Sequence, residues 1–205
     1  MLQPATEEYC CQCAVGRIAC PSRERAHVNE SGTRETGQST TTVDSRDPSP
    51  VDAPESPDGV RLCFGCRVLN RCRFGIKGEH LGDDGVVMSR VVCSPENEGG
   101  PEVAHGGWTA SVMDELVGHT LLLRDEFAVT GTLTVKFVRP VPVGWPLIGR
   151  AWIAETENRK VFVRATLELE SSGAIVAEAD ATMIKRPATH FELHYQWLET
   201  QRGKE

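Results

Sequence analysis

A mostly apolar helix, predicted over residues 106–123, constrains the fold of this chain more than any other segment. Its sequence, GGWTASVMDELVGHTLLL, places apolar side chains around most of the circumference, which is typical of a helix buried among other elements. One stripe differs, because residues spaced i, i+4, i+7 and i+11 share a face, and here they are Gly107, Ser111, Asp114 and Gly118. A lone carboxylate in apolar surroundings costs free energy unless something uses or satisfies it. We therefore predict that Asp114 is functional.

Two further titratable residues lie beside that stripe. Glu115 and His119 are one helical turn apart, and residues at i and i+4 are neighbours on a helix surface. We expect them to form an exposed pair at the edge of the helix, without a role in the chemistry.

The segments around this helix predict antiparallel strands joined by turns. Residues 74–80 and 86–93 flank the sequence Gly-Asp-Asp-Gly at 82–85, which is typical of a hairpin. A loop rich in glycine and proline is expected over 94–104, and strands over 129–138, 147–157, 160–169 and 175–185. One long helix beside a run of antiparallel strands is an α+β arrangement.

The first 59 residues differ in composition from the rest. They contain six of the twelve prolines, one aromatic residue, and ten acidic against five basic side chains. Such a segment buries too little apolar surface to offset the entropy of ordering it. We predict an acidic, disordered tail over 1–59, one domain over 60–188, and a short C-terminal helix or tail over 189–205, with the helix at 191–201.

Charge and hydropathy limit the partners of this chain. The net charge of -7 argues against binding nucleic acid or an anionic membrane, because both require a basic surface. No apolar stretch approaches the roughly 18 residues of a membrane span, and no secretion signal is visible at the N-terminus. We expect a soluble, cytoplasmic protein.

Eight cysteines raise the question of disulfides and metal. Without a secretion signal a disulfide framework is not expected. The Cys63-x-x-Cys66 pair is half of a zinc site, with Cys72 and His80 as the nearest candidates to complete it, but no second pair follows at zinc-finger spacing. We favour reduced thiols and predict neither a metal nor a cofactor.

The start of the predicted helix offers a site for an anion. Free backbone N–H groups at Gly106 and Gly107, at the positive end of the helix dipole, stabilise an oxyanion. Asp114 lies nine residues after His105, which is about 13 Å along the axis and roughly the opposite face. One helix cannot bring both groups to the same carbonyl, whereas a second, antiparallel helix can. We therefore predict a site between two copies of the chain.

Five motifs occur in a fixed order along residues 63–186. They are Cys63-Phe-Gly-Cys66, Gly99-Gly-Pro-Glu-Val-Ala-His105-Gly-Gly, Asp114, Thr130 at the start of a strand that ends in Arg139-Pro140, and Ala177-Glu-Ala-Asp-Ala181. With this order and spacing the chain resembles the hotdog-fold acyl-CoA thioesterases, in the branch of the phenylacetate-pathway thioesterases and the thioesterase-superfamily-member enzymes. Arg67 stands where that branch commonly has glycine.

The resemblance implies a fold, an assembly and an activity. The fold is a long central helix wrapped by a curved antiparallel β-sheet, assembled as a homodimer or homotetramer. The activity is hydrolysis of acyl-CoA in fatty acid metabolism. It implies that Asp114 acts as base or nucleophile, that the Gly106 N–H polarises the thioester carbonyl, that Thr130 helps to hold the attacking water, and that His105 orients the loop or contacts the thioester.

Substrate-binding residues follow from the same resemblance and from the charge of the substrate. Gly107 lies beside the carbonyl site, and Asn97 stands near the polar position that precedes His-Gly-Gly in the family. The phosphates of coenzyme A require cations, for which the candidates are Lys136, Arg139, Arg159 and Lys160; each is equally explained as a solvated charge. The alternatives for function are a non-catalytic acyl-ligand-binding protein, a hotdog hydratase or dehydratase and, least favoured, a zinc-dependent scaffold.

Overall fold

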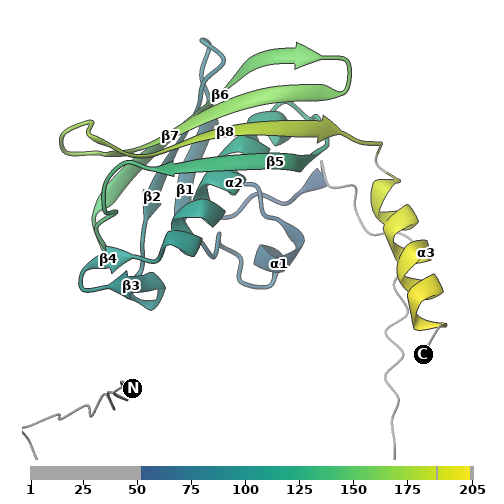
Figure 1. The fold of residues 1–205 in the computed structure, drawn as a ribbon, viewed down its shortest axis with the longest axis horizontal. Helices are drawn as coiled ribbons and strands as arrows, with labels where there is room; N and C mark the ends of the chain where they lie inside the picture. Colours follow the sequence, from purple (N-terminus) through teal and green to yellow (C-terminus); the bar gives the residue numbers. More distant parts are fainter. Residues whose placement is uncertain (1–51, 188, 204–205) are drawn as a thin grey trace, which may run out of the picture. The chain divides into compact units, whose positions relative to one another are not determined.

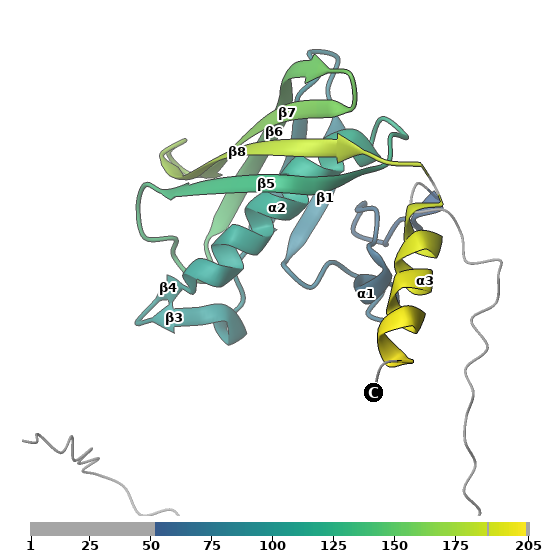
Figure 2. The same cartoon turned by 45° about the vertical axis from the view of Figure 1, so that its right-hand side comes forward.

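The computed structural model describes residues 52–187 and 189–203. Six antiparallel strands form one sheet in the order β1-β2-β6-β7-β8-β5, and the sheet curves around helix α2 (Figures 1 and 2). The bounds are β1 Ile76–Leu81, β2 Val87–Val92, α2 Gly106–Leu122, β5 Ala128–Phe137, β6 Pro146–Glu157, β7 Lys160–Leu169 and β8 Ile175–Lys185. The predicted α+β hotdog fold is confirmed, and these elements begin and end within two residues of the expected positions.

Smaller elements surround this core. They are α1 Phe64–Arg67, the 3-10 turn η2 Pro95–Asn97, the short strands β3 Glu98–Gly100 and β4 Val103–Ala104, and the C-terminal helix α3 His190–Arg202. β3 and β4 pair inside the segment predicted as a loop, and the sequence did not predict α1. No helix in the described ranges is long and apolar enough to cross a membrane.

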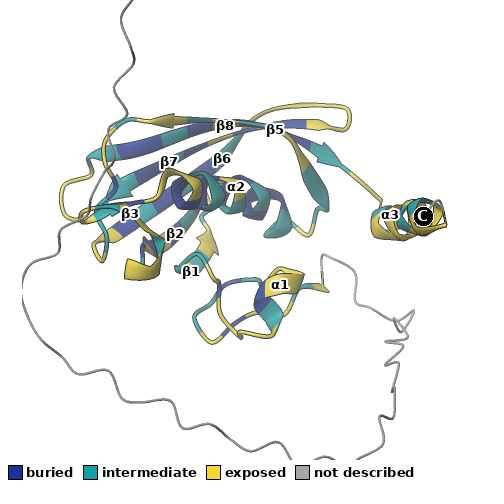
Figure 3. Cartoon of the chain, turned by 60° about the horizontal axis from the view of Figure 1, so that its bottom comes forward, coloured by how far each residue is buried: buried dark blue, intermediate teal, exposed yellow. Residues whose placement is uncertain are grey.

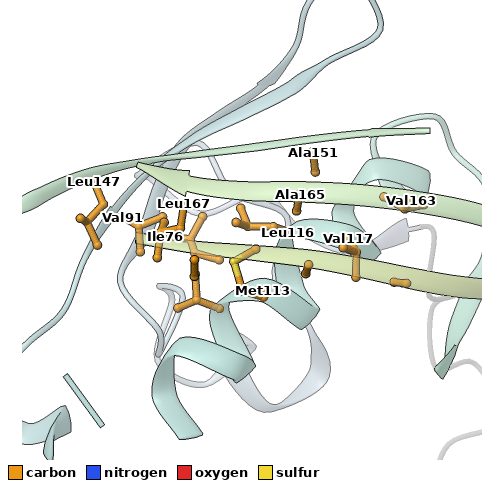
Figure 4. Packing of buried hydrophobic residues seen from close by; sticks show 14 of the residues in the cluster. Ile76, Val91, Met113, Leu116, Val117, Leu147, Ala151, Val163, Ala165 and Leu167 are labelled. Atoms are coloured by element: carbon orange, nitrogen blue, oxygen red, sulfur yellow. The ribbon is translucent and has the colours of Figure 1, made fainter. Parts of the chain in front are cut away.

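The core lies between α2 and the face of the sheet that the helix covers (Figure 4). Met113, Leu116 and Val117 of α2 are fully buried, and so are Leu147 of β6 and Leu167 of β7. Each such side chain contributes about 1.5–3 kcal/mol through burial. In Figure 3 the buried residues gather on α2 and the neighbouring strands, whereas α3 has none.

Helix and sheet approach each other closely at Gly149 of β6. A Cβ atom built at this position would lie 2.6 Å from Cδ2 of Leu116, closer than real Cβ contacts allow. A glycine is therefore required where α2 crosses β6, and this close approach fixes the height of the helix over the sheet.

The two edge strands of the sheet, β1 and β5, differ in whether another segment covers them. Backbone N–H groups of Gly78 and Glu79 in β1 donate to the carbonyl oxygens of Asp58 and Gly59, at 2.7 and 2.9 Å, so an upstream segment covers that edge. At the other edge, β5 pairs with β8 alone among the described strands. β5 is ten residues long, and its unpaired side presents a row of free N–H and C=O groups.

The segment that covers β1 belongs to the predicted tail. Leu62 N–H donates to the carbonyl of Pro54 at 2.9 Å, Val60 N–H donates to the hydroxyl of Ser56 at 3.2 Å, and Ser56 is buried. Residues 54–59 thus pack on the domain, upstream of the boundary expected at residue 60. Residues 1–51 lie outside the described residues, and disorder there stays a prediction.

Candidate active site

Asp114 and Thr130 form the centre of the candidate site. Asp114 lies in the middle of α2, and Thr130 lies near the start of β5, just before an irregularity in its pairing with β8. The Thr130 hydroxyl donates a hydrogen bond to Oδ1 of Asp114 at 2.8 Å, and both residues are exposed. This bond orients the carboxylate and leaves its second oxygen available to another partner.

The carboxylate opens into a hollow of about 510 Å³ on the surface of α2. Its walls come from α2, the segment around α1 and β5, and the lining residues are Cys63, Arg73, Phe74, Ala110, Ser111, Asp114, Glu115 and Leu133. The Ser111 hydroxyl donates back to the carbonyl oxygen of Gly107 at 2.9 Å. Its donor is therefore directed at the helix backbone.

His105 caps the N-terminus of α2. Its Nδ1 accepts the hydrogen bond of the Gly107 N–H at 2.9 Å, so the imidazole is unprotonated at that nitrogen. The Gly107 N–H is thereby occupied, whereas in the described part of the chain the Gly106 N–H has no acceptor and Gly106 is exposed. Of the two glycine donors, only Gly106 is free to bind a developing oxyanion.

Asn97 supports the loop that carries His105. Its carbonyl oxygen accepts from the His105 N–H at 2.7 Å, and its side-chain amide donates to the Ser94 hydroxyl at 2.9 Å. Gly99 passes so close that a Cβ there would lie 2.6 Å from the Cα of His105. The side-chain hydrogen bond of Asn97 is thus made within the loop.

The Gly106 and Asp114 halves lie apart in one subunit. α2 is continuous from Gly106 to Leu122, so eight residues and about 12 Å of helix axis separate the two. Gly106 lies instead at the other end of β5, where a Cβ on it would be 3.7 Å from Cε1 of Phe137. Each half is therefore next to a different end of the open edge strand.

The four candidate cations also divide between the two ends of β5. At its C-terminal end, Lys136 Nζ lies 2.8 Å from Glu178, and Arg139 donates to the carbonyl of Ile175 at 2.6 Å. Arg159 and Lys160 lie at the β6–β7 turn, where Lys160 and Val129 are both in register with Ile184, near the start of β5. All four are exposed.

Next to Asp114 lies a buried ion triad, formed by Glu115 and His119 of α2 and Glu79 of β1. The prediction of an exposed Glu115–His119 pair is therefore wrong. His119 Nδ1 lies 2.6 Å from Glu79 of β1, and Nε2 lies 3.0 Å from Glu115; the three side chains are 6%, 1% and 20% exposed. Burial alone lowers the pKa of His119, but the Glu115 and Glu79 carboxylates outweigh it and raise this pKa to about 10. The imidazole is therefore cationic at neutral pH.

The cysteines of the α1 region are free thiols. Cys63 is exposed, whereas Cys66 and Cys72 are buried, and the Arg73 N–H donates to Cys66 Sγ at 3.4 Å. His80 is exposed on β1 and contacts the carbonyl oxygen of Gly78. Among residues 52–187 and 189–203, no three His, Cys, Asp or Glu side chains lie close enough together to hold a metal ion.

Comparisons with known proteins relate this arrangement to one family. Residues 102–176 match the family model described as the thioesterase superfamily. Acyl-coenzyme A thioesterase THEM4 of Xenopus laevis is 31% identical over 100 residues, which cover 47% of this chain and 45% of the frog protein. The chain spans about half or less of the length of the curated relatives it matches.

Two solved structures share the fold. Conserved protein PA5202 from Pseudomonas aeruginosa is 22% identical, with a TM-score of 0.51 over 61% of this chain and 95% of that one. The structure of smu.793 from Streptococcus mutans UA159 bound to acetyl CoA is 18% identical, with a TM-score of 0.51 over 57% and 92% of the two chains. Residues 102–176 are thus similar to the thioesterase superfamily, and α2 with its sheet has the same hotdog fold as these two structures.

Proposed function

We propose that this chain hydrolyses acyl-CoA thioesters to a free acid and coenzyme A, with Asp114 as base or nucleophile. The observation that carries the proposal is the Asp114 carboxylate, held by Thr130 and open to a hollow beside a helix whose apolar side chains form the core. The names of the relatives agree with it: the frog protein is an acyl-coenzyme A thioesterase, and smu.793 is bound to acetyl CoA.

As a base, Asp114 takes a proton from a water molecule whose oxygen attacks the thioester carbonyl carbon. The carbonyl oxygen becomes an oxyanion that the Gly106 N–H of the second subunit stabilises. The C–S bond then breaks, and coenzyme A leaves as a thiolate that takes up a proton. As a nucleophile, the carboxylate itself attacks the carbon, expels the thiolate and forms an anhydride that water hydrolyses. Thr130 holds the carboxylate in either case.

The open edge of β5 supports a homodimer as the working unit. Antiparallel pairing of β5 with β5 of a second copy, across a twofold axis, would satisfy the unpaired backbone groups of both strands. It would also set the Thr130 end of one strand against the Phe137 end of the other. Asp114 of one subunit would then meet Gly106 of its partner, because each lies beside one of those ends. A homotetramer would contain two such dimers.

The same pairing accounts for the divided cations. Lys136 and Arg139 from one subunit would approach Arg159 and Lys160 of the other, since the two pairs lie at opposite ends of β5. Four cations beside each site suit the phosphates of coenzyme A. We also propose that the protein acts in fatty acid metabolism and is located in the cytoplasm.

Release of thiol tests the proposal. Purified protein is mixed with a panel of acyl-CoA substrates and a chromogenic thiol reagent, and the rate is compared with that of Asp114→Asn. Thiol release that depends on Asp114 supports a hydrolase. If acyl-CoA binds tightly to the wild type but no thiol is released, the chain is a non-catalytic acyl-ligand-binding protein and not a hydrolase.

A further inference from the structure

A second hollow lies along α2 beyond Asp114, toward the C-terminus of the helix. It has a volume of about 210 Å³, and its apolar walls include Leu62, Phe64, Leu122, Phe127, Ala128 and Phe191. Cys63 and Glu115 line both this hollow and the one that holds Asp114. The two hollows are therefore neighbours on one face of α2, which the segment around α1 covers.

Gly118 has no side chain, so the backbone of α2 borders the second hollow directly at this position. A Cβ atom at Gly118 would meet nothing within 4 Å, and the residue lines the second hollow. A glycine inside a helix costs about 0.8–1.0 kcal/mol relative to alanine, and packing against a neighbour does not require it here. What the glycine provides is space, one turn beyond Asp114.

Aromatic rings close the far end of the hollow. Phe191, at the start of α3, lies 5.6 Å from the ring of Phe127 and 6.2 Å from that of Phe64, between centroids. This wall comes from three separate elements: the α1 segment, the connection after α2, and α3. Because Phe191 is 36% exposed, its side chain has room to be displaced.

We propose that the second hollow binds the acyl chain of the substrate, and that this chain is linear and of medium length. The inference rests on the proposed thioesterase function: with the thioester at Asp114, the chain extends past Gly118 toward Phe191. The axial distance from Asp114 to Leu122 is about 12 Å, and since C–C bonds are about 1.5 Å long, a zigzag chain of about ten carbons spans it.

Chain-length selectivity tests this subsite. The ratio of kcat/KM for dodecanoyl-CoA to that for butanoyl-CoA is expected to fall by about ten-fold or more in Gly118→Leu, because the added side chain fills the path. Phe191→Ala opens the far wall and is expected to raise the ratio of hexadecanoyl-CoA to decanoyl-CoA. Leu193→Ala, also on α3 but outside the hollow, is the matched control and should change neither ratio. Ratios that do not move in Gly118→Leu and Phe191→Ala overturn the inference.

Binding of free fatty acids separates this inference from the proposed activity. Calorimetric titration with dodecanoate is expected to give binding to the wild type and at least ten-fold weaker binding to Gly118→Leu. If dodecanoate binds in this way but no acyl-CoA is hydrolysed, the subsite stands and the hydrolase fails. If thiol release depends on Asp114 while Gly118→Leu alters neither binding nor selectivity, the hydrolase stands and the subsite fails. If nothing binds and nothing is hydrolysed, both fail.

Discussion

The Asp114 carboxylate has one oxygen held and one oxygen open. Thr130 donates to Oδ1, and the hollow leaves room for water or a carbonyl group at Oδ2. A hydrogen bond to a charged acceptor contributes about 1.5–3 kcal/mol. Most of the chemistry should therefore depend on the charge of Asp114, and a smaller part on its orientation by Thr130.

Substitutions at these two residues should separate the two contributions. Asp114→Asn preserves the shape and removes the charge, so kcat should fall by about 10²–10⁴. Thr130→Ala removes the hydrogen bond and should cost about 10–100-fold, whereas Thr130→Ser retains a hydroxyl and should recover most of the rate. Thiol release measured for all three variants, with matching circular dichroism spectra, checks this order. Equal losses in Thr130→Ser and Thr130→Ala would contradict a role for the hydroxyl.

The buried His119 predicts a dependence of stability on pH. Its pKa in the folded protein, about 10, lies above the unfolded value of 6.5. The stabilisation is therefore fully present below pH 6.5 and is lost as pH rises toward 10. His119→Gln leaves Glu79 buried without a cation, which should cost about 3–5 kcal/mol at neutral pH.

Denaturant unfolding from pH 6 to pH 10 measures this effect. The wild type should lose stability across that range, and His119→Gln should be less stable at pH 6 with a flatter profile. His80→Gln, an exposed histidine on the same strand as Glu79, is the matched control and should follow the wild type. Parallel profiles for the wild type and His119→Gln would show that the imidazole is not charged in the folded state.

Some of these residues are predictable from the sequence, and others are not. The sequence predicts Asp114 because it interrupts the apolar surface of a helix, whereas Thr130 is a candidate by resemblance alone. The pairing of Glu115 with His119 was visible from their spacing, but not its burial. Glu79 lies 40 residues away from His119 and reaches it only when β1 packs beside α2. Contacts of this kind depend on the fold, so spacing along the chain does not show them.

Elements with a strong pattern were predictable, and elements held by distant contacts were not. β7 and β8 bury alternate residues along most of their length, β6 does so over its first half, and α2 is apolar over most of its surface. The four-residue α1 and the β3–β4 pair have no such pattern. Residues 54–59 have the composition of the tail, yet the carbonyl groups of Asp58 and Gly59 accept hydrogen bonds from β1 because its edge is available there.

Two truncations test where the domain begins. A chain starting at residue 52 should fold with a melting temperature near that of the whole protein. A chain starting at residue 63 loses Val60 and Leu62, which are 1% and 2% exposed, and uncovers β1. Burial of two such side chains contributes about 3–6 kcal/mol, so this shorter chain should melt at much lower temperature or aggregate. Equal melting temperatures for the two truncations would contradict the packing of residues 54–62.

At the scale of the described domain, one sheet edge is open, and half of the proposed active site lies near each end of it. β1 is covered by residues 58–59, whereas β5 is unpaired on one side among the described strands. In the proposed dimer, the carboxylate and the oxyanion donor lie beside opposite ends of β5, so a complete site forms when two copies pair in antiparallel orientation. The spacing of Gly106 and Asp114 on one helix already predicts a site between two copies, whereas the strand proposed to pair, β5, is identified only by the topology.

Activity of a mixed dimer tests the shared site most directly. Asp114→Asn removes the carboxylate, and Gly106→Pro removes the N–H donor at a position where proline is compatible with a helix start. Each homodimer should be nearly inactive. In a mixed dimer one site carries both substitutions and the other carries neither, so co-refolded protein should regain up to about a quarter of wild-type thiol release from random pairing. A mixture as inactive as its parents, in a sample where mass spectrometry detects the mixed dimer, would contradict a site shared between two subunits.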